Sequence, residues 1–326
     1  MKSYGLAVLM LTMIMTGCGE TPDAPESAPG MEVRNDVAEL RAQFVPHEMS
    51  AGTLHLSDGD CGALLDLVKA ARAVGEIFSV QAWAGNPEFA PKVAALQGPE
   101  AQAAQDYYRI MVGPWDRLDH HRPFIGDMPH PPGAGYYPED MTEEEFNAWL
   151  DEHPDDREAF TSLHTLIRRD GDRLVAVPYS KAFAEPLKRA AEAMRAAAAA
   201  TDNASLKRFL ELRAAAFFTD DYYESDMAWM DLDSPIEVVI GPYETYEDSL
   251  FGYKEAFESF ICVAQPEDSA RLEIFKSQLP FLEANLPIPD EHKNFNRGAE
   301  SPIRVVDELL VTGDSRSGVQ TIAFNL

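Results

Sequence analysis

Positive charge is scarce in this chain of 326 residues. Lysine and arginine together number 27, against 55 aspartates and glutamates, so the formal net charge is −28. A surface this negative repels phosphate backbones, and nucleic-acid binding is therefore excluded. Hydrophobic residues still make up 45% of the chain, which is enough to build a sizeable core, and the length is comfortable for two lobes.

Sequence patterns that carry a complete active site are absent as well. The eight histidines include no H-x-x-x-H pair, and there is no C-x-x-C, no G-x-S-x-G elbow and no phosphate-binding G-x-x-x-x-G-K-[ST] loop. His120 and His121 are adjacent, so on a helix or a strand their side chains point apart. The sequence therefore predicts neither a catalytic residue nor a metal ligand in this chain.

Long hydrophobic runs are also missing, apart from one near the start. Residues 6–15 are almost wholly apolar and follow Lys2, which is typical of a signal peptide and too short for a membrane-spanning helix of about 20 residues. The run ends at Cys18 in a pattern that resembles the bacterial lipobox, although an ordinary signal peptide with an incidental cysteine stays open. We expect residues 1–18 to be a lipoprotein signal peptide and 19–36 a disordered tether.

Lipidation of Cys18 would fix the protein to a membrane through lipid alone, in the cell envelope and facing the periplasm. Only Cys61 and Cys262 then remain. In an oxidising compartment such an even pair permits a disulfide. The alternative is two unrelated buried thiols, since each cysteine lies in an apolar context that reads as helical.

Helical patterns dominate from about Val37 onward. Capping residues precede periodic apolar runs at three places, and an alanine-rich run adds a fourth helix. The expected helices follow Ser57, follow Thr142, span 182–200, and span 206–217.

Strand patterns are fewer and scattered, at 174–177, 236–240, 303–306 and 319–326. Helix dominance with a few strands predicts an α+β fold with a small, incomplete β-barrel or sheet. The last strand pattern stops at Leu326 with no turn or tail, so we expect a chain cut short. We expect three parts: a mainly helical substrate-binding lobe with barrel strands at 37–265, the start of a crossing at 266–300, and returning barrel strands at 301–326.

Carboxylates and aromatic rings alternate in two neighbouring segments, 217–231 and 241–248. The second directly follows a predicted strand and contains Glu244 and Tyr246. Carboxylates beside tyrosine rings at a strand end suit the binding of a protonated amine, because the acid pairs with the ammonium and the rings add cation–π attraction. The competing interpretation is that the rings build core while the acids face solvent.

The same segment carries a family resemblance. The run from Ile240 to Asp248, I-G-P-Y-E-T-Y-E-D, resembles the dipeptidyl peptidase III family of zinc metallopeptidases, in its bacterial and plant branch. Four further segments match in order, and the resemblance spans nearly everything after about residue 40. They are Gly113-Pro114-Trp115-Asp116-Arg117, Tyr137-Pro138-Glu139-Asp140-Met141-Thr142, Val177-Pro178-Tyr179-Ser180 and Asp221-Tyr222-Tyr223-Glu224-Ser225-Asp226.

The resemblance implies roles for particular residues. Glu244 matches the family acid that holds the free N-terminus of a peptide, Tyr246 a neighbouring substrate tyrosine, and Asn325 an asparagine that orients the peptide. It also implies zinc in a full-length form, bound by a histidine motif that this chain lacks. Glu247 departs from the animal and fungal pattern, which has arginine there, so strict release of dipeptides is in doubt.

Two interpretations of function follow. In the first, the chain is the N-terminal, substrate-binding portion of a lipid-anchored, zinc-dependent hydrolase that acts on peptides or related amides. In the second, it is a non-catalytic periplasmic binding or interaction lipoprotein on the same scaffold. In both, the expected partner is a peptide or an amine-bearing small substrate.

Overall fold

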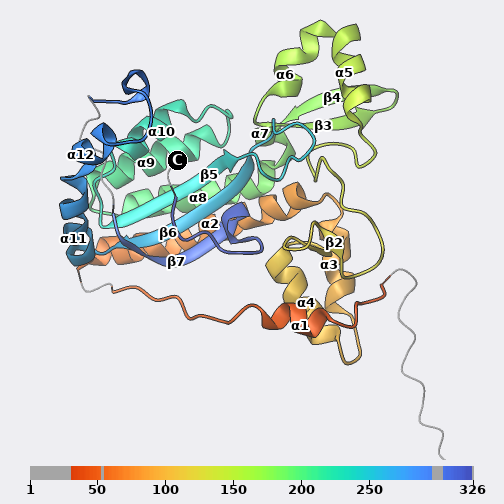
Figure 1. Ribbon diagram of the computed structural model, residues 1–326, viewed down its shortest axis with the longest axis horizontal. Coiled ribbons are helices and arrows are strands. Elements are labelled where there is room, and N and C mark those ends of the chain that lie inside the picture. Colours follow the sequence, from red (N-terminus) through yellow and green to blue (C-terminus); the bar gives the residue numbers. More distant parts are fainter. Residues whose placement is uncertain (1–30, 53–54, 296–303, 325–326) are drawn as a thin grey trace, which may run out of the picture.

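The computed structural model describes residues 31–52, 55–295 and 304–324, and every structural statement below concerns these residues. The fold is α+β, with mostly helical elements and small antiparallel sheets (Figure 1). Cys18 and Asn325, and with them the predicted lipidation site and one predicted substrate residue, lie outside the described residues.

A three-stranded antiparallel sheet organises the larger part of the molecule. Its order is β5 (Ile236–Glu244), β6 (Ala256–Ala264) and β7 (Val306–Gly313). Alternate side chains of β5 and β6 on one face join the main hydrophobic core, whereas those on the opposite face belong to a smaller apolar cluster. Both faces of β5 are therefore buried, which explains its nearly continuous apolar sequence.

The core-facing side of this sheet is covered by two long helices, α2 (Asp58–Ala82) and α8 (Ala184–Ala200), which also pack on each other (Figure 1). The predicted cap of α2 is confirmed, because the Ser57 hydroxyl accepts a hydrogen bond from the Asp60 amide at 3.0 Å. Alanines line the contact between the two helices and allow their close approach. Helix α9 (Ala204–Ala216) packs on α8, and α10 (Tyr223–Met230) packs on α9.

A smaller α/β unit stands at one end of the sheet, at the upper right of Figure 1. It consists of α5 (Glu143–Glu152), α6 (Arg157–Thr161) and a hairpin of β3 (Thr165–Asp170) and β4 (Arg173–Pro178). The predicted Thr142 cap is confirmed, since its hydroxyl accepts from the Glu145 amide at 3.1 Å. Short α7 (Tyr179–Ala182) leads from β4 into α8.

A second group of helices lies below this unit in Figure 1. It contains α1 (Val37–Ala42), α3 (Asn86–Ala94) and α4 (Ala101–Met111), with a minimal ladder of β1 (Trp115–Asp116) and β2 (Arg122–Pro123). After β6 the chain continues through α11 (Pro266–Lys276) and α12 (Leu279–Ala284). Single 3₁₀ turns occupy Pro154–Asp156, Asp290–His292 and Asp314–Arg316. No described helix has the combined length and apolar character needed to cross a bilayer.

The described part of the predicted tether is packed, which corrects that prediction for residues 31–36. Val33 forms an antiparallel bridge with Ile125, and the Gly126 amide donates to the Glu32 carbonyl at 2.8 Å. Met31 is buried in the cluster that contains Ile125. The physical reason is that two apolar residues inside a polar stretch find partners in the loop after β2.

The strand predictions need three corrections. Cys262 lies on strand β6 and not in a helix, because the sequence 256–264 is apolar at nearly every position and so carries no period. Residues 319–324 form no strand; Ile322 is 90% exposed, and the Phe324 ring contacts Phe260 at 4.5 Å between centroids. Residues 304–305 form no strand, and β7 begins only at Val306. The sheets of the described chain stay open, with β5 and β7 as edges of the three-stranded sheet, so the predicted alternative of a small sheet is confirmed.

The disulfide left open by the sequence is not formed. Cys61 is exposed on α2, whereas Cys262 is buried on β6, and both are free. Burial, followed by the charges of nearby carboxylates, raises the pKa of the Cys262 thiol far above its usual value. Cys262 therefore behaves as a small hydrophobic residue of the sheet.

Candidate functional site

The two predicted substrate residues lie together where β5 ends. Glu244 is the last residue of β5, and a bulge between Pro242 and Glu244 turns the strand out of its regular register. Tyr246 is 76% exposed. The charge of Glu244, followed by a hydrogen bond to it, raises the pKa of the Tyr246 phenol. The structure thus places an accessible tyrosine against a half-buried carboxylate.

A second carboxylate lies behind this pair, on the neighbouring strand. Glu258 of β6 is only 3% exposed, and it sits opposite Gly241 of β5 and Gly313 of β7. Gly313 has φ 78°, and a Cβ there would meet the Phe257 carbonyl oxygen at 2.1 Å. Only glycine allows the strands to approach so closely beside the buried acid.

Burial favours the protonated form of two carboxyl groups at this end of the sheet. Desolvation, and next the charge of Glu244, raises the pKa of Glu258 to about 7. Asp314 follows Gly313, and its pKa is raised to about 8 by burial and by the charge of Glu247. A cation that binds here would therefore meet both ionised and protonated carboxyl groups and could displace protons from the latter.

The segment that follows Glu244, residues 245–255, is a polar turn with three buried charged side chains, and one of them, Asp248, organises it. One carboxylate oxygen accepts the amides of Leu250 and Phe251, each at 3.1 Å. The other oxygen accepts the amides of Tyr253 at 2.8 Å and Lys254 at 3.2 Å. The Tyr137 phenol donates to this second oxygen at 2.9 Å. A single side chain thereby satisfies four of the backbone donors of the turn.

A buried ion pair ties the same turn to the loop after β1. The Arg117 guanidinium forms a two-pronged contact with Glu247, and one prong spans 2.9 Å from Nη2 to Oε2. Both side chains are largely buried, at 13% and 7% exposure. Burial tends to raise the pKa of Glu247, but the charge and hydrogen bonds of Arg117 outweigh it, so the pKa is lowered. Glu247, where the family's animal and fungal pattern has arginine, is thus a structural ion-pair partner.

The ammonium of Lys254 closes the turn from the opposite side. It donates to the carbonyl oxygens of Phe160 and Ser162, each at 2.7 Å, and to the Thr165 hydroxyl at 2.9 Å. Burial lowers the pKa of Lys254 to about 7, while the charge of Asp248 acts in the opposite direction. These bonds join the turn to the α5–β4 unit.

Sequence reasoning missed three residues of this site: Glu258, Asp314 and Arg117. Glu258 could have been predicted, because it is a glutamate inside the otherwise apolar run 256–264 and is therefore expected to be buried. Burial of an acid is costly, so its presence there indicates a specific role. Asp314 follows a glycine at a strand end and left only a turn signal. Arg117 lies about 130 residues from its partner, so no local pattern could connect them.

The described residues do not fit the zinc that the family resemblance implies. No set of three or more His, Cys, Asp or Glu side chains within 31–52, 55–295 and 304–324 is arranged to hold a metal ion. The carboxylates near Glu244 are instead engaged by Tyr246, Ser315 or Arg117.

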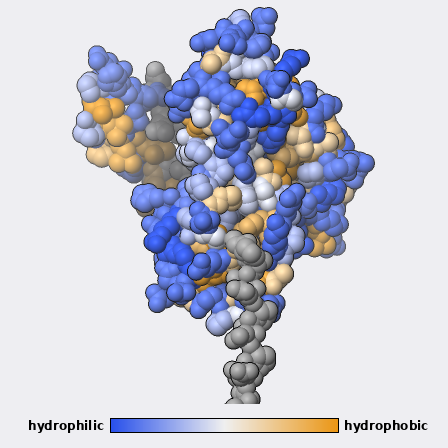
Figure 2. Space-filling model, turned by 90° about the vertical axis from the view of Figure 1, so that its right-hand side faces the viewer, coloured by the Kyte–Doolittle hydropathy of each residue, from blue (hydrophilic) through white to orange (hydrophobic). Residues whose placement is uncertain are grey.

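Polar residues predominate on the face of the molecule drawn in Figure 2, and apolar residues occur there in smaller groups. The net charge of −28 favours cationic over anionic ligands.

Comparison with known proteins points to one family. Residues 157–299 match the model of peptidase family M49. Dipeptidyl peptidase III from Caldithrix abyssi superposes with a TM-score of 0.84 at 51% identity, covering 88% of this chain and 55% of that one. The enzyme from Corallococcus sp. strain EGB gives 0.80 at 40% identity, covering 89% and 54%. Nudix hydrolase 3 of Arabidopsis thaliana is 33% identical over 87% of this chain and 43% of its own length.

The α+β fold is that of the two solved dipeptidyl peptidase III structures. The resemblance to the dipeptidyl peptidase III family that the motifs first suggested is thus confirmed. The chain spans about half the length of the proteins that it matches.

The buried ion pair yields a first prediction. Arg117→Met should lower the free energy of unfolding by about 3–5 kcal/mol, because Glu247 is left buried without a partner, and the double change Arg117→Met with Glu247→Leu should restore much of it. Urea unfolding followed by circular dichroism measures both. The exposed pair of Arg189 and Glu76 is the control, and Arg189→Met there should cost no more than about 1 kcal/mol. Equal costs for the two arginine variants would contradict the role of the buried pair.

The raised pKa of Glu258 yields a second prediction. The folded state holds this proton more tightly than the unfolded chain, so the contribution of Glu258 to stability should fall as pH rises from 4.5 to about 7. The full fall amounts to at most about 3 kcal/mol. Glu258→Gln should remove this part of the pH dependence in urea unfolding series, whereas Glu224→Gln at an exposed position of α10 should not. Parallel pH profiles for wild type and Glu258→Gln would refute the assignment.

Proposed function

We propose that this chain forms the peptide-binding portion of a dipeptidyl peptidase III-like hydrolase. The observation that carries the proposal is the pairing of Glu244 with exposed Tyr246 at the strand end, in front of the buried carboxyls of Glu258 and Asp314. In such a partly desolvated place, the attraction between a carboxylate and an ammonium exceeds that of a surface pair. The free N-terminus of a peptide is the group that fits.

In this proposal each residue has a separate task. The Glu244 carboxylate accepts hydrogen bonds from the N-terminal ammonium, and the Tyr246 phenol, already against that carboxylate, flanks the peptide. Asn325 would orient the peptide, a role that rests on the resemblance alone. Glu258 and Asp314 add negative potential without carrying full charge at neutral pH, so the site attracts a cation at a smaller cost in mutual repulsion.

Hydrolysis itself belongs to the proposal only for a longer protein. The family resemblance implies that zinc and its ligands complete the active site there. In this proposal the residues described in this chain bind and orient the peptide, and no group of three or more of their His, Cys, Asp or Glu side chains could hold a metal ion. Hydrolysis of peptides or related amides is the proposed reaction.

Replacing Glu244 tests the amine-binding role. Glu244→Gln keeps the side-chain volume and removes the charge, so it should weaken binding of a peptide with a free N-terminus by about 10- to 150-fold. The N-acetylated form of the same peptide, neutral at that end, should lose little. Titration calorimetry with the 326-residue chain measures both peptides, and Glu224→Gln controls for loss of one negative charge elsewhere. Equal losses for the free and acetylated peptides would make Glu244 a structural residue.

We further propose that Cys18 carries a lipid that anchors the protein in the cell envelope, facing the periplasm. The support is the apolar run before Cys18 and its lipobox-like ending. Cys18→Ser should leave the protein as an unprocessed precursor or in the soluble fraction. Detergent phase partitioning and the size of the product measure this outcome. A mature-sized Ser variant that still partitions into detergent would disprove lipidation at Cys18.

A further inference from the structure

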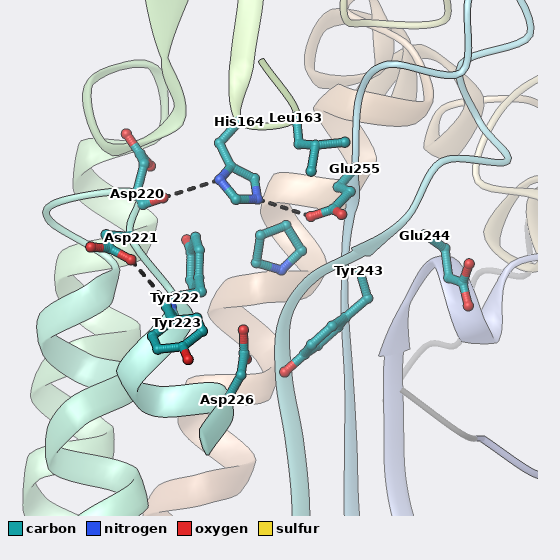
Figure 3. A pocket seen from close by; sticks show the side chains of 11 residues that line it. Leu163, His164, Asp220, Asp221, Tyr222, Tyr223, Asp226, Tyr243, Glu244 and Glu255 are labelled. Carbon is teal, nitrogen blue, oxygen red and sulfur yellow. Dashed lines mark hydrogen bonds and ion pairs between the residues drawn. The ribbon is translucent and has the colours of Figure 1, made fainter. Parts of the chain in front are cut away.

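A pocket of about 540 Å³ opens beside the strand end, on the other side of Tyr243 from the Glu244 carboxylate (Figure 3). Its walls come from the loop between α9 and α10, the first residues of α10, the end of β5, and the residues that precede β3 and β6. Figure 3 shows the Glu244 carboxylate directed away from the other labelled side chains, toward β7. The pocket therefore adjoins the proposed N-terminus site and shares Glu244 with it, while its other charged residues are its own.

The lining is acidic and aromatic. Five of the residues drawn in Figure 3 are carboxylates, namely Asp220, Asp221, Asp226, Glu244 and Glu255, and three are tyrosines. Two of these acids have cationic or ionisable partners: Asp226 contacts the buried Arg213, and Glu255 accepts a hydrogen bond from His164 at 2.9 Å.

The other acids of the pocket retain negative charge or acceptor capacity. Asp220 accepts the Ser180 amide at 2.9 Å, and burial raises the pKa of its carboxyl. Asp221 accepts only the Tyr223 amide, at 3.2 Å, and has no ion-pair partner in the described part of the chain. Carboxylates exceed cations in the pocket wall, so its potential is negative.

A buried hydroxyl in the same pocket lacks a partner. Tyr222 is 6% exposed, and its phenolic oxygen makes no hydrogen bond to any described residue. The ring is held between the Arg213 guanidinium at 5.1 Å and the His164 ring at 4.9 Å. In Figure 3 the hydroxyl points toward the side of the pocket that His164 and Asp220 line. Because such an orphaned group costs free energy, a ligand group that bonds to it is favoured.

We propose that this pocket binds a small organic cation through a protonated primary amine, with the ammonium donating to the Tyr222 oxygen and pairing with Asp221. The exposed ring of Tyr223 at the rim adds cation–π attraction. A primary amine fits better than a quaternary one, because only the former has N–H groups to offer the orphaned oxygen. A metal ion fits poorly, since the described acids do not converge as metal ligands.

The probe for the test is 1,5-diaminopentane, and 1,5-pentanediol is its uncharged counterpart of similar shape. Titration calorimetry with the 326-residue chain at low salt should detect the diamine and not the diol. Tyr222→Phe and Asp221→Asn should each weaken diamine binding at least about threefold. Tyr222→Phe removes no existing hydrogen bond, so the variant keeps the fold, which urea unfolding verifies.

Two matched variants separate the pocket from its surroundings. Glu224→Gln removes one charge from α10 at a position that does not line the pocket. This change should alter the dissociation constant of the diamine by no more than about twofold. An equal loss for Glu224→Gln and Asp221→Asn would mean general attraction to an acidic surface and would overturn the proposal, as would absence of diamine binding. If Glu244→Gln weakened diamine binding and Tyr222→Phe did not, the amine would bind at Glu244 and not at Tyr222. This result would also overturn the proposal. The peptide experiment judges the N-terminus site independently, since Tyr222→Phe should leave peptide affinity unchanged.

Discussion

The polar turn at residues 245–255, with its buried charged side chains, is the constraint on which the strand end depends. Asp248 collects four backbone amides and the Tyr137 phenol, and the Arg117–Glu247 pair and the Lys254 ammonium fix the turn on two sides. Buried groups of this kind are costly unless every partner is present, so the turn has one arrangement or none. That arrangement sets where β5 stops, and with it the position of Glu244.

The same turn explains why distant motifs belong together. Segments that the sequence presents as separate matches meet here: the loop with Arg117 holds Glu247, and the loop with Tyr137 holds Asp248. The acids at the strand end then differ by environment. Glu247 is ionised because a guanidinium faces it, whereas Glu258 and Asp314 keep protons because burial and like charges oppose ionisation. A site with this mixture attracts a cation and can release protons when one binds.

Features that depend on contacts between residues near in the chain could be predicted from the sequence, whereas features that depend on distant contacts could not. Ser57 and Thr142 cap helices through contacts three residues away, so both helices were predictable, as was β5 from its β-branched run. Strand β6 was not, because a strand buried on both faces has no alternation to detect. Glu244 and Tyr246 were predicted to bind substrate from a local motif, and the structure brings the two residues together. The Arg117–Glu247 contact, which depends on the assembled fold, was beyond any pattern in the chain.

The two proposed amine-binding sites adjoin each other and share Glu244, and Tyr243 lines the pocket as well. The Tyr243 phenol accepts a hydrogen bond from Arg213 at 2.9 Å, and this guanidinium occupies the space that a side chain at Gly241 would need. The end of β5 is thus fastened to α9. Because Arg213 is itself paired with Asp226, this contact fixes the position of Tyr243 without adding net positive charge to the pocket wall. An amine bound at either proposed site would therefore meet carboxylates beside a tyrosine whose position the core has already set.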